Sequence, residues 1–84
     1  MVNSSSQIEN ISIEDYTQKC RLKIASDIKA IREKRGYSQE DLAEIMGVNR
    51  TTLSKIENGK FSISIDYIAK FSFHLGFDFS LVDK

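Results

Sequence analysis

The stretch that most constrains the fold runs from Tyr37 to Gly59 and reads YSQEDLAEIMGVNRTTLSKIENG. It predicts two short helices joined by a tight turn. Ser38 is a candidate N-cap, and Asp41 stands three residues later as its capping-box partner. Apolar residues then recur at helical spacing, at Leu42, Ala43 and Met46. Gly47 can end this first helix, because the residue after a helix often adopts the left-handed conformation.

The second helix of this stretch is expected from Arg50 to Asn58, with Asn49 as its N-cap and Gly59 as its stop. Its apolar side holds Leu53 and Ile56, with Val48 ahead of it. Its other side carries long or hydroxylated side chains, at Arg50, Thr51, Ser54 and Lys55. This pattern is typical of a helix-turn-helix, whose second helix enters the DNA major groove. An ordinary helical hairpin with one solvated side would show the same pattern.

The spaced string GYSQxxLAxxMGVxxxxLSxxENG resembles the phage repressor and Cro family of helix-turn-helix proteins, also called the XRE family. The resemblance extends from about Ile28 to Gly76, which is more than half of the chain. It implies an all-α, lambda-repressor-like bundle of four to five helices that binds double-stranded DNA.

The resemblance also implies roles for individual residues of this chain. The expected base contacts are Arg50, Thr51 and Lys55. The expected contacts with the DNA backbone are Gln39, Asn49, Ser54, Asn58 and Lys60, with Gln39 packed between a phosphate and the start of the second helix. A partly buried ion pair is expected between Arg32 and Glu57.

A longer helix is predicted ahead of this motif, from Ser12 or Ile13 to about Arg35. Its apolar stripe consists of Ile24, Ile28 and Ile31, extended toward the N-terminus by Tyr16 and Cys20. The family's own first helix starts nearer Arg21. This helix is therefore longer than usual, or it is two helices with a break. Its basic residues are interpreted as a solvated face: Lys19, Arg21, Lys23, Lys29, Lys34 and Arg35.

The distribution of charge supports a nucleic-acid partner although the net charge of the chain is zero. Residues 17–60 carry ten basic and six acidic side chains, a balance of +4, whereas residues 1–16 carry −3 and residues 61–84 carry −1. Local charge at a binding surface governs attraction to DNA more than the total does. The positive charge therefore coincides with the predicted helix-turn-helix.

Composition argues against several other classes of protein. One His, one Cys and four Gly provide no catalytic set, metal cluster or glycine-rich phosphate loop, so we expect no enzyme, no metal and no cofactor. Cys20 cannot form an internal disulfide, which fits a cytoplasmic protein, and we expect it to be a buried or half-buried structural residue. The chain has neither a long apolar run nor a signal-peptide pattern, so no membrane association is expected.

The chain divides into three predicted parts. Residues 1–12 are polar and form a flexible arm, for which a DNA-reaching role is the alternative. Residues 13–76 form the helix-turn-helix domain. Its last helix begins after the N-cap Ser64 and ends at Gly76. The residues expected to face the core from this helix are Ile65, Ile68, Phe71 and Leu75.

The third part, residues 77–84, is predicted to be a dimerisation strand. Phe77, Phe79 and Leu81 alternate with Asp78, Ser80 and Val82, which is the period of a half-buried strand. A single strand leaves its backbone groups unpaired, so we expect antiparallel pairing with the same strand of a second copy. The ending LGFDFSLV also resembles the dimer-forming tail of Hip-type antitoxins.

The sequence thus predicts a cytoplasmic homodimer that acts as a transcriptional repressor at an inverted-repeat operator. Two alternatives stay open. One is an antitoxin that represses its own operon and binds a cognate toxin protein. The other is a protein-interaction module that has lost DNA binding.

Overall fold

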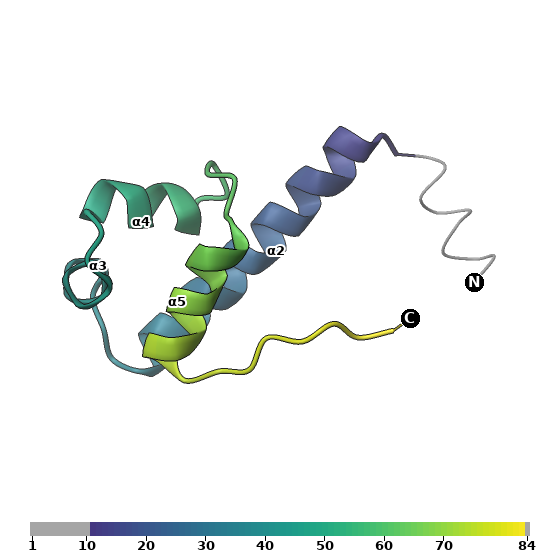
Figure 1. Ribbon diagram of the computed structural model, residues 1–84. Helices are drawn as coiled ribbons and strands as arrows, with labels where there is room; N and C mark the ends of the chain where they lie inside the picture. Colours follow the sequence, from purple (N-terminus) through teal and green to yellow (C-terminus); the bar gives the residue numbers. More distant parts are fainter. Residues whose placement is uncertain (1–10, 84) are drawn as a thin grey trace.

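The computed structural model describes residues 11–83, which form an all-α bundle of four helices with an extended C-terminal tail (Figure 1). The helices are α2 (Ile13–Lys34), α3 (Gln39–Met46), α4 (Arg50–Glu57) and α5 (Ile65–Leu75). The expected arm, residues 1–12, lies outside the described residues except for its last two. None of the described helices is both long enough and apolar enough to span a membrane.

Helix α2 is one unbroken helix of 22 residues, so the alternative of two helices with a break is wrong. Ser12 begins it by accepting a hydrogen bond from the backbone N–H of Asp15 at 3.1 Å. Its C-terminal half buries Ala25 and Ile28 against the other helices. Its N-terminal half projects beyond the bundle (Figure 1).

The core lies where α2, α3, α4 and α5 meet. Helix α4 packs against α2 and α3, and α5 packs against the same two helices. The buried cluster consists of Ile28, Leu42, Ala43, Met46, Leu53, Ile56, Phe71 and Leu75. Val48 and Tyr37 pack against it from the two turns that flank α3. Every helix thus contributes apolar side chains to one core, which fixes α3 and α4 relative to each other.

The end of α4 rests directly on α2. Gly59 follows the C-cap Asn58 with a φ of +70°, a conformation that favours glycine. A Cβ on Gly59 would lie 2.7 Å from Leu22 Cδ2, so glycine also permits the close approach to α2. The side-chain amide of Gln18 donates to the carbonyl of Gly59 at 3.3 Å. Part of the projecting half of α2 therefore supports the end of α4.

The tail after Gly76 is held at its first residue. The backbone N–H of Phe77 donates to Ser72 O at 3.3 Å, and the Ser72 hydroxyl donates to Phe77 O. Arg35 Nε donates to the carbonyl of Leu75 at 2.8 Å and thereby ties the end of α2 to the end of α5. Residues 11–83 contain no β-strand, because a ladder needs a second strand. The pairing of residues 77–84 with a second chain stays a prediction.

Two residues expected in or near the core are exposed instead. Ile65 is 63% exposed, because it lies about a quarter turn away from the stripe of Ile68, Phe71 and Leu75 on a helix with 3.6 residues per turn. Cys20 is exposed because it lies on the side of α2 opposite Gln18 and Leu22, which contact the end of α4. The spacing of apolar residues did not show which side of α2 packs against α4, and the prediction for Ile65 overlooked its offset from the stripe of its own helix.

We expect Leu53→Ala to lower the free energy of unfolding by about 2–5 kcal/mol, because Leu53 is fully buried and the change leaves a cavity in the core. Ile45→Ala is the matched control. Ile45 lies on the neighbouring helix α3 and is 44% exposed, so its loss should cost about 0.5 kcal/mol. Urea unfolding monitored by circular dichroism measures both values, and equal losses would contradict the described packing of α4.

Candidate nucleic-acid interface

Helices α3 and α4 form a helix-turn-helix whose ends are fixed by capping residues. Ser38 and Asp41 make the predicted capping box at the start of α3, with Asp41 N–H donating to the Ser38 hydroxyl at 3.0 Å. Gly47 ends α3 in the left-handed conformation, and Val48 N–H donates to Ala43 O at 3.0 Å. The turn is therefore short and held by backbone hydrogen bonds to the end of α3, which helps to set the angle between the two helices.

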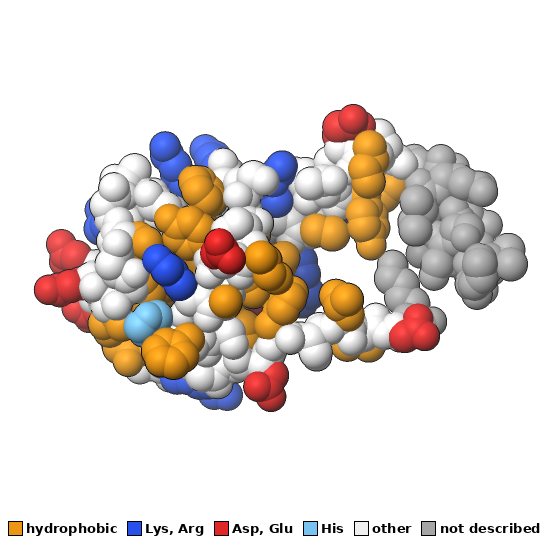
Figure 2. All heavy atoms as spheres, viewed as in Figure 1, with side chains coloured by type: hydrophobic (Ala, Val, Ile, Leu, Met, Phe, Trp, Pro, Cys, Tyr) orange, Lys and Arg blue, Asp and Glu red, His pale blue; other side chains and the backbone are white. Residues whose placement is uncertain are grey.

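Helix α4 has one buried and one exposed side. Leu53 and Ile56 are buried, so the side chains on the opposite side point away from the core. Arg50, Thr51 and Lys55 are exposed there, and Ser54 is partly exposed. In Figure 2, Lys and Arg atoms lie along the outer edge of the molecule over α4. The structure thus brings all the expected base-contacting residues to one exposed, positively charged side.

Three of the five residues expected at the DNA backbone lie around the two ends of α4, whereas Ser54 lies within α4 and Gln39 begins α3. Asn49, Asn58 and Lys60 are exposed. Asn49 Oδ1 accepts hydrogen bonds from Thr52 N at 2.9 Å and Thr52 Oγ1 at 2.8 Å, which leaves its amide NH₂ as the group that can donate to a phosphate. Lys60 N–H donates to Lys55 O at 2.9 Å and closes the turn that follows α4.

A buried ion pair ties the interface to α2. Arg32 Nε lies 2.6 Å from Glu57 Oε2, and Arg32 Nη2 lies 3.0 Å from Glu57 Oε1, a bidentate geometry. The two residues are only 7% and 8% exposed. The hydrogen bond with Glu57 raises the pKa of Arg32 above its ordinary value, so the guanidinium keeps its charge throughout the working pH range.

Two further hydrogen bonds extend this pair to α3 and to the preceding turn. Arg32 Nη1 donates to the carbonyl of Tyr37 at 2.7 Å. Gln39 Nε2 donates to Glu57 Oε1 at 3.0 Å, which joins the first residue of α3 to the last residue of α4. This contact differs from the expected one, which placed Gln39 at the start of the second helix. No buried side-chain polar atom of the described residues lacks a partner.

Sequence reasoning missed two side chains that hold the elements in place. Arg35 was assigned to a solvated face, yet it donates to the carbonyls of Leu75 and Gly76. Gln18 was not singled out, although its amide bonds Gly59 at the end of α4. Both partners lie about forty positions away in the sequence, so no local pattern could have found them. Within residues 11–83, no cluster of His, Cys, Asp and Glu is arranged to hold a metal ion.

We expect Glu57→Ala to lower the free energy of unfolding by about 3–5 kcal/mol, because it leaves the buried guanidinium of Arg32 without its carboxylate. Lys23→Ala is the control, since the Lys23–Asp27 pair is exposed and its loss should cost less than about 1 kcal/mol. Chemical unfolding measures the loss in free energy of unfolding for each of the two variants. A second variant with Arg32→Met and Glu57→Leu together should recover part of the loss, and no recovery would argue against an uncompensated charge as the cause.

Comparison with known proteins also identifies a helix-turn-helix in the part of the chain that contains α3 and α4. The family described as Helix-turn-helix (HTH_3) matches residues 28–81. A hypothetical transcription factor of Neisseria meningitidis is 34% identical over 59 residues, which cover 70% of this chain and 56% of that protein. An HTH-type transcriptional regulatory protein of Pyrococcus furiosus is 44% identical over 39 residues, which cover 46% of this chain.

The chain spans only 12% of the length of the Pyrococcus furiosus relative, so the two share the helix-turn-helix region alone. A solved structure named MDT Protein superposes with a TM-score of 0.65 at 25% identity, covering 75% of this chain and 89% of that one. The four-helix bundle therefore has a counterpart of nearly the same size. Since the family match extends over more than half of its residues, the chain belongs to the HTH_3, or XRE, family of helix-turn-helix proteins.

Proposed function

We propose that this chain is a sequence-specific DNA-binding transcription regulator that acts as a homodimer on an inverted-repeat operator. The observation that carries the proposal is the exposed side of α4, where Arg50, Thr51 and Lys55 stand together on a helix whose other side is locked into the core. Long cationic side chains suit the acceptors of guanine in the major groove, and a threonine methyl suits the methyl group of thymine.

Contacts with the phosphate backbone would set the register of α4 in the groove. Three of these contacts lie on either side of the base-contacting residues and are exposed: Asn49 at the start of α4, and Asn58 and Lys60 after its end. Gln39 and Ser54 complete the proposed set. Gln39 is fixed by its hydrogen bond to Glu57, so its remaining amide hydrogen is already oriented before DNA binds. Such contacts make affinity fall steeply with salt, because each one releases counterions.

A two-fold axis would place two α4 helices in successive major grooves, about 34 Å apart. The proposed dimer contact is the tail, in which Phe77 packs on the core while Phe79 and Leu81 are 48% and 92% exposed. Apolar side chains on an unpaired extended segment are typical of a strand that pairs with a second copy. Repression would follow from occlusion of RNA polymerase at the operator.

A second candidate function is that of an antitoxin, which would repress its own operon and also bind a toxin protein. The observation that favours it is the exposed apolar surface of α5, where Ile65 and Phe73 are 63% and 83% exposed. Contacts with DNA through α4 make no use of this surface. An exposed apolar patch of this kind is typical of a protein–protein contact.

Arg50→Ala should weaken specific DNA binding by about 1–3 kcal/mol and relax the preference at one base pair of each half-site. Selection of bound sequences from random duplex DNA, at about 150 mM salt, measures both effects and identifies the operator. Lys34→Ala is the matched control, because Lys34 is an exposed cation outside the helix-turn-helix. If a folded, dimeric protein selects no motif, the DNA-binding proposal is wrong, and a pull-down for a toxin partner becomes the next experiment.

Leu81→Asp should shift the protein from dimer to monomer, raising the dimer dissociation constant at least about tenfold, because pairing of the tails would bury an unpaired carboxylate. Leu81 is 92% exposed in the single chain, so its replacement should leave the fold of the monomer intact. Ile45→Asp, an exposed position on α3, is the control. Sedimentation equilibrium measures the association, and a dimer that survives Leu81→Asp unchanged removes the tail from the interface.

A further inference from the structure

The first half of α2, residues 13–23, lies beside the end of α4, although the two segments are far apart in the sequence. The side-chain amide of Gln18 donates to the carbonyl of Gly59 at 3.3 Å, and a Cβ on Gly59 would lie 2.7 Å from Leu22 Cδ2. Gln18 and Leu22 are one helical turn apart, so two successive turns of α2 contact the same residue. The turn that follows α4 therefore has α2 as its direct neighbour.

Arg21 adds a positive charge to this contact. Its Nη1 donates to Gln18 Oε1 at 3.1 Å, while Gln18 Nε2 donates to Gly59 O, so one amide group connects the guanidinium to the end of α4. Arg21 is partly exposed, and its hydrogen bond to Gln18 lies at the surface. That is the side-chain hydrogen bond which Arg21 makes within residues 11–83, so most of the N–H donors of its guanidinium remain available.

The charge of Arg21 is not neutralised by a carboxylate. Lys23, on the same half of α2, pairs with Asp27 at 3.2 Å. Arg21, in contrast, makes no ion pair within the part of the chain that the structure describes. A cation that is held in place by a neutral amide keeps its attraction for an external anion.

The groups that surround Gly59 on the α4 side also suit an anion. Lys60 directly follows Gly59 and is exposed, and its backbone N–H donates to Lys55 O at 2.9 Å, which fixes its place in the turn. Asn58 precedes Gly59 and is exposed as well. In Figure 2, Lys and Arg atoms follow the upper edge of the molecule from α4 to the turn after it and the neighbouring part of α2. Cations from two elements thus flank the end of α4.

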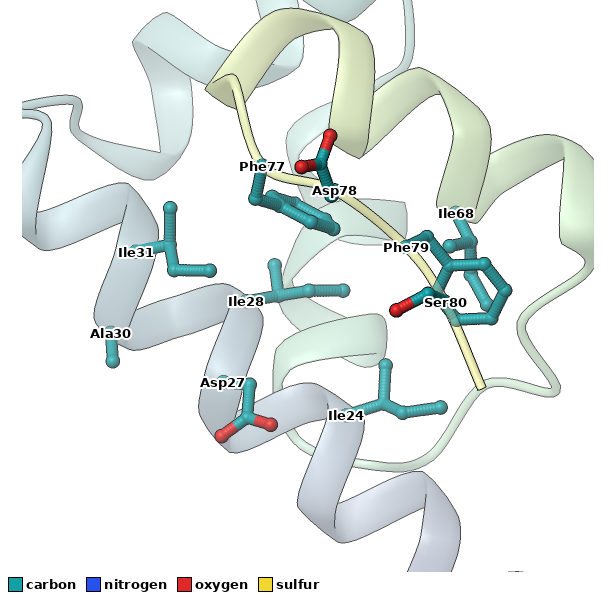
Figure 3. Close-up of a pocket in the computed structure, with 10 residues that line it drawn as sticks. All are labelled: Ile24, Asp27, Ile28, Ala30, Ile31, Ile68, Phe77, Asp78, Phe79 and Ser80. Atoms are coloured by element: carbon teal, nitrogen blue, oxygen red, sulfur yellow. The ribbon is translucent and has the colours of Figure 1, made fainter. Parts of the chain in front are cut away.

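The remaining surface of α2 is less suited to DNA. Ile24 and Ile31 project toward the tail, where they line an apolar groove of about 460 Å³, and they lie more than a quarter turn around the helix from Gln18 (Figure 3). The first turn of α2 carries Glu14 and Asp15, whose carboxylates repel phosphate. The candidate contact is therefore confined to the turn that holds Gln18 and the arginine bound to it.

We propose that Arg21 is a contact with the DNA backbone, whose guanidinium binds a phosphate beside the one that Lys60 contacts. Gln18 is a positioning residue, because it holds this guanidinium against the end of α4. The first half of α2 thereby belongs to the DNA-binding surface and enlarges the backbone contact beyond the helix-turn-helix itself. This inference rests on the DNA binding of the proposed function and assigns Arg21 to that surface instead of to a solvated face.

The salt dependence of DNA binding tests the contact, with the operator obtained by sequence selection. Arg21→Gln should lower the affinity about three- to tenfold, and the slope of log K against log salt should become less steep by about 0.9 per subunit, because one phosphate per subunit is no longer neutralised. The selected sequence should stay the same, since a phosphate contact does not read bases. Arg21→Lys keeps the charge and should keep most of the slope.

Lys23→Gln is the matched control. Lys23 lies on the same half of α2, but its charge is paired with Asp27 and it points away from Gln18. Its replacement should leave both the affinity and the slope at the native values. Ethylation interference then locates the contact: ethylation of a phosphate at the edge of each half-site should block binding of the native protein and have no effect on binding of Arg21→Gln.

The other outcomes overturn the inference in distinguishable ways. If a folded Arg21→Gln variant shows the native slope and the native ethylation pattern, DNA binding stands and Arg21 takes no part in it. If Arg21→Lys loses as much of the slope as Arg21→Gln, the loss does not come from the charge and the inference fails. If the native protein selects no sequence and binds no duplex DNA, the proposed function fails and this inference fails with it.

Discussion

The bidentate pair between Arg32 and Glu57 is the interaction on which the arrangement of the other elements depends. It joins the long helix α2 to the last residue of α4 in a nearly solvent-free position. Desolvation of two charges is expensive, and this pair compensates by using the remaining hydrogen-bonding positions. Tyr37 O accepts from Arg32, and Gln39 donates to Glu57, so the turn before α3 and α3 itself are held by the same two charges. A pair of this kind adds geometric precision more than net stability.

That precision matters because α4 is short. Eight residues give little more than two turns, and an isolated helix of this length is not stable in water. Its conformation comes from the N-cap Asn49, from burial of Leu53 and Ile56, and from the ion pair at its last residue. Each of these constraints acts on the inner side or on an end. The outer side is left with exposed polar side chains on a rigid support, which is what recognition of base edges requires.

Short-range sequence patterns predicted where the helices begin and end, but they predicted less well which side chains are exposed and which distant residues they contact. Ser38, Asn49 and Ser64 cap helices as expected, since capping depends on residues only three positions apart. The turn at Gly47 follows from the same kind of local rule, and the HTH_3 match confirms the family to which the motif points. The exposure of Cys20 could not be predicted, because it depends on which side of α2 packs against α4, whereas that of Ile65 follows from its offset from the stripe of its own helix. Arg35 and Gln18 bond residues about forty positions away, which no short-range pattern encodes.

The unbroken length of α2 has a mechanical consequence. From Ile13 to Arg32 the helix spans about 28 Å without a proline or any other break. The end of α4 contacts α2 at two places along this length, through Arg32 in the last turns of α2 and through Gln18 and Leu22 in its first half. Two separate contacts prevent α4 from pivoting on α2. Any tilt of α2 therefore turns the exposed side of α4 through the same angle.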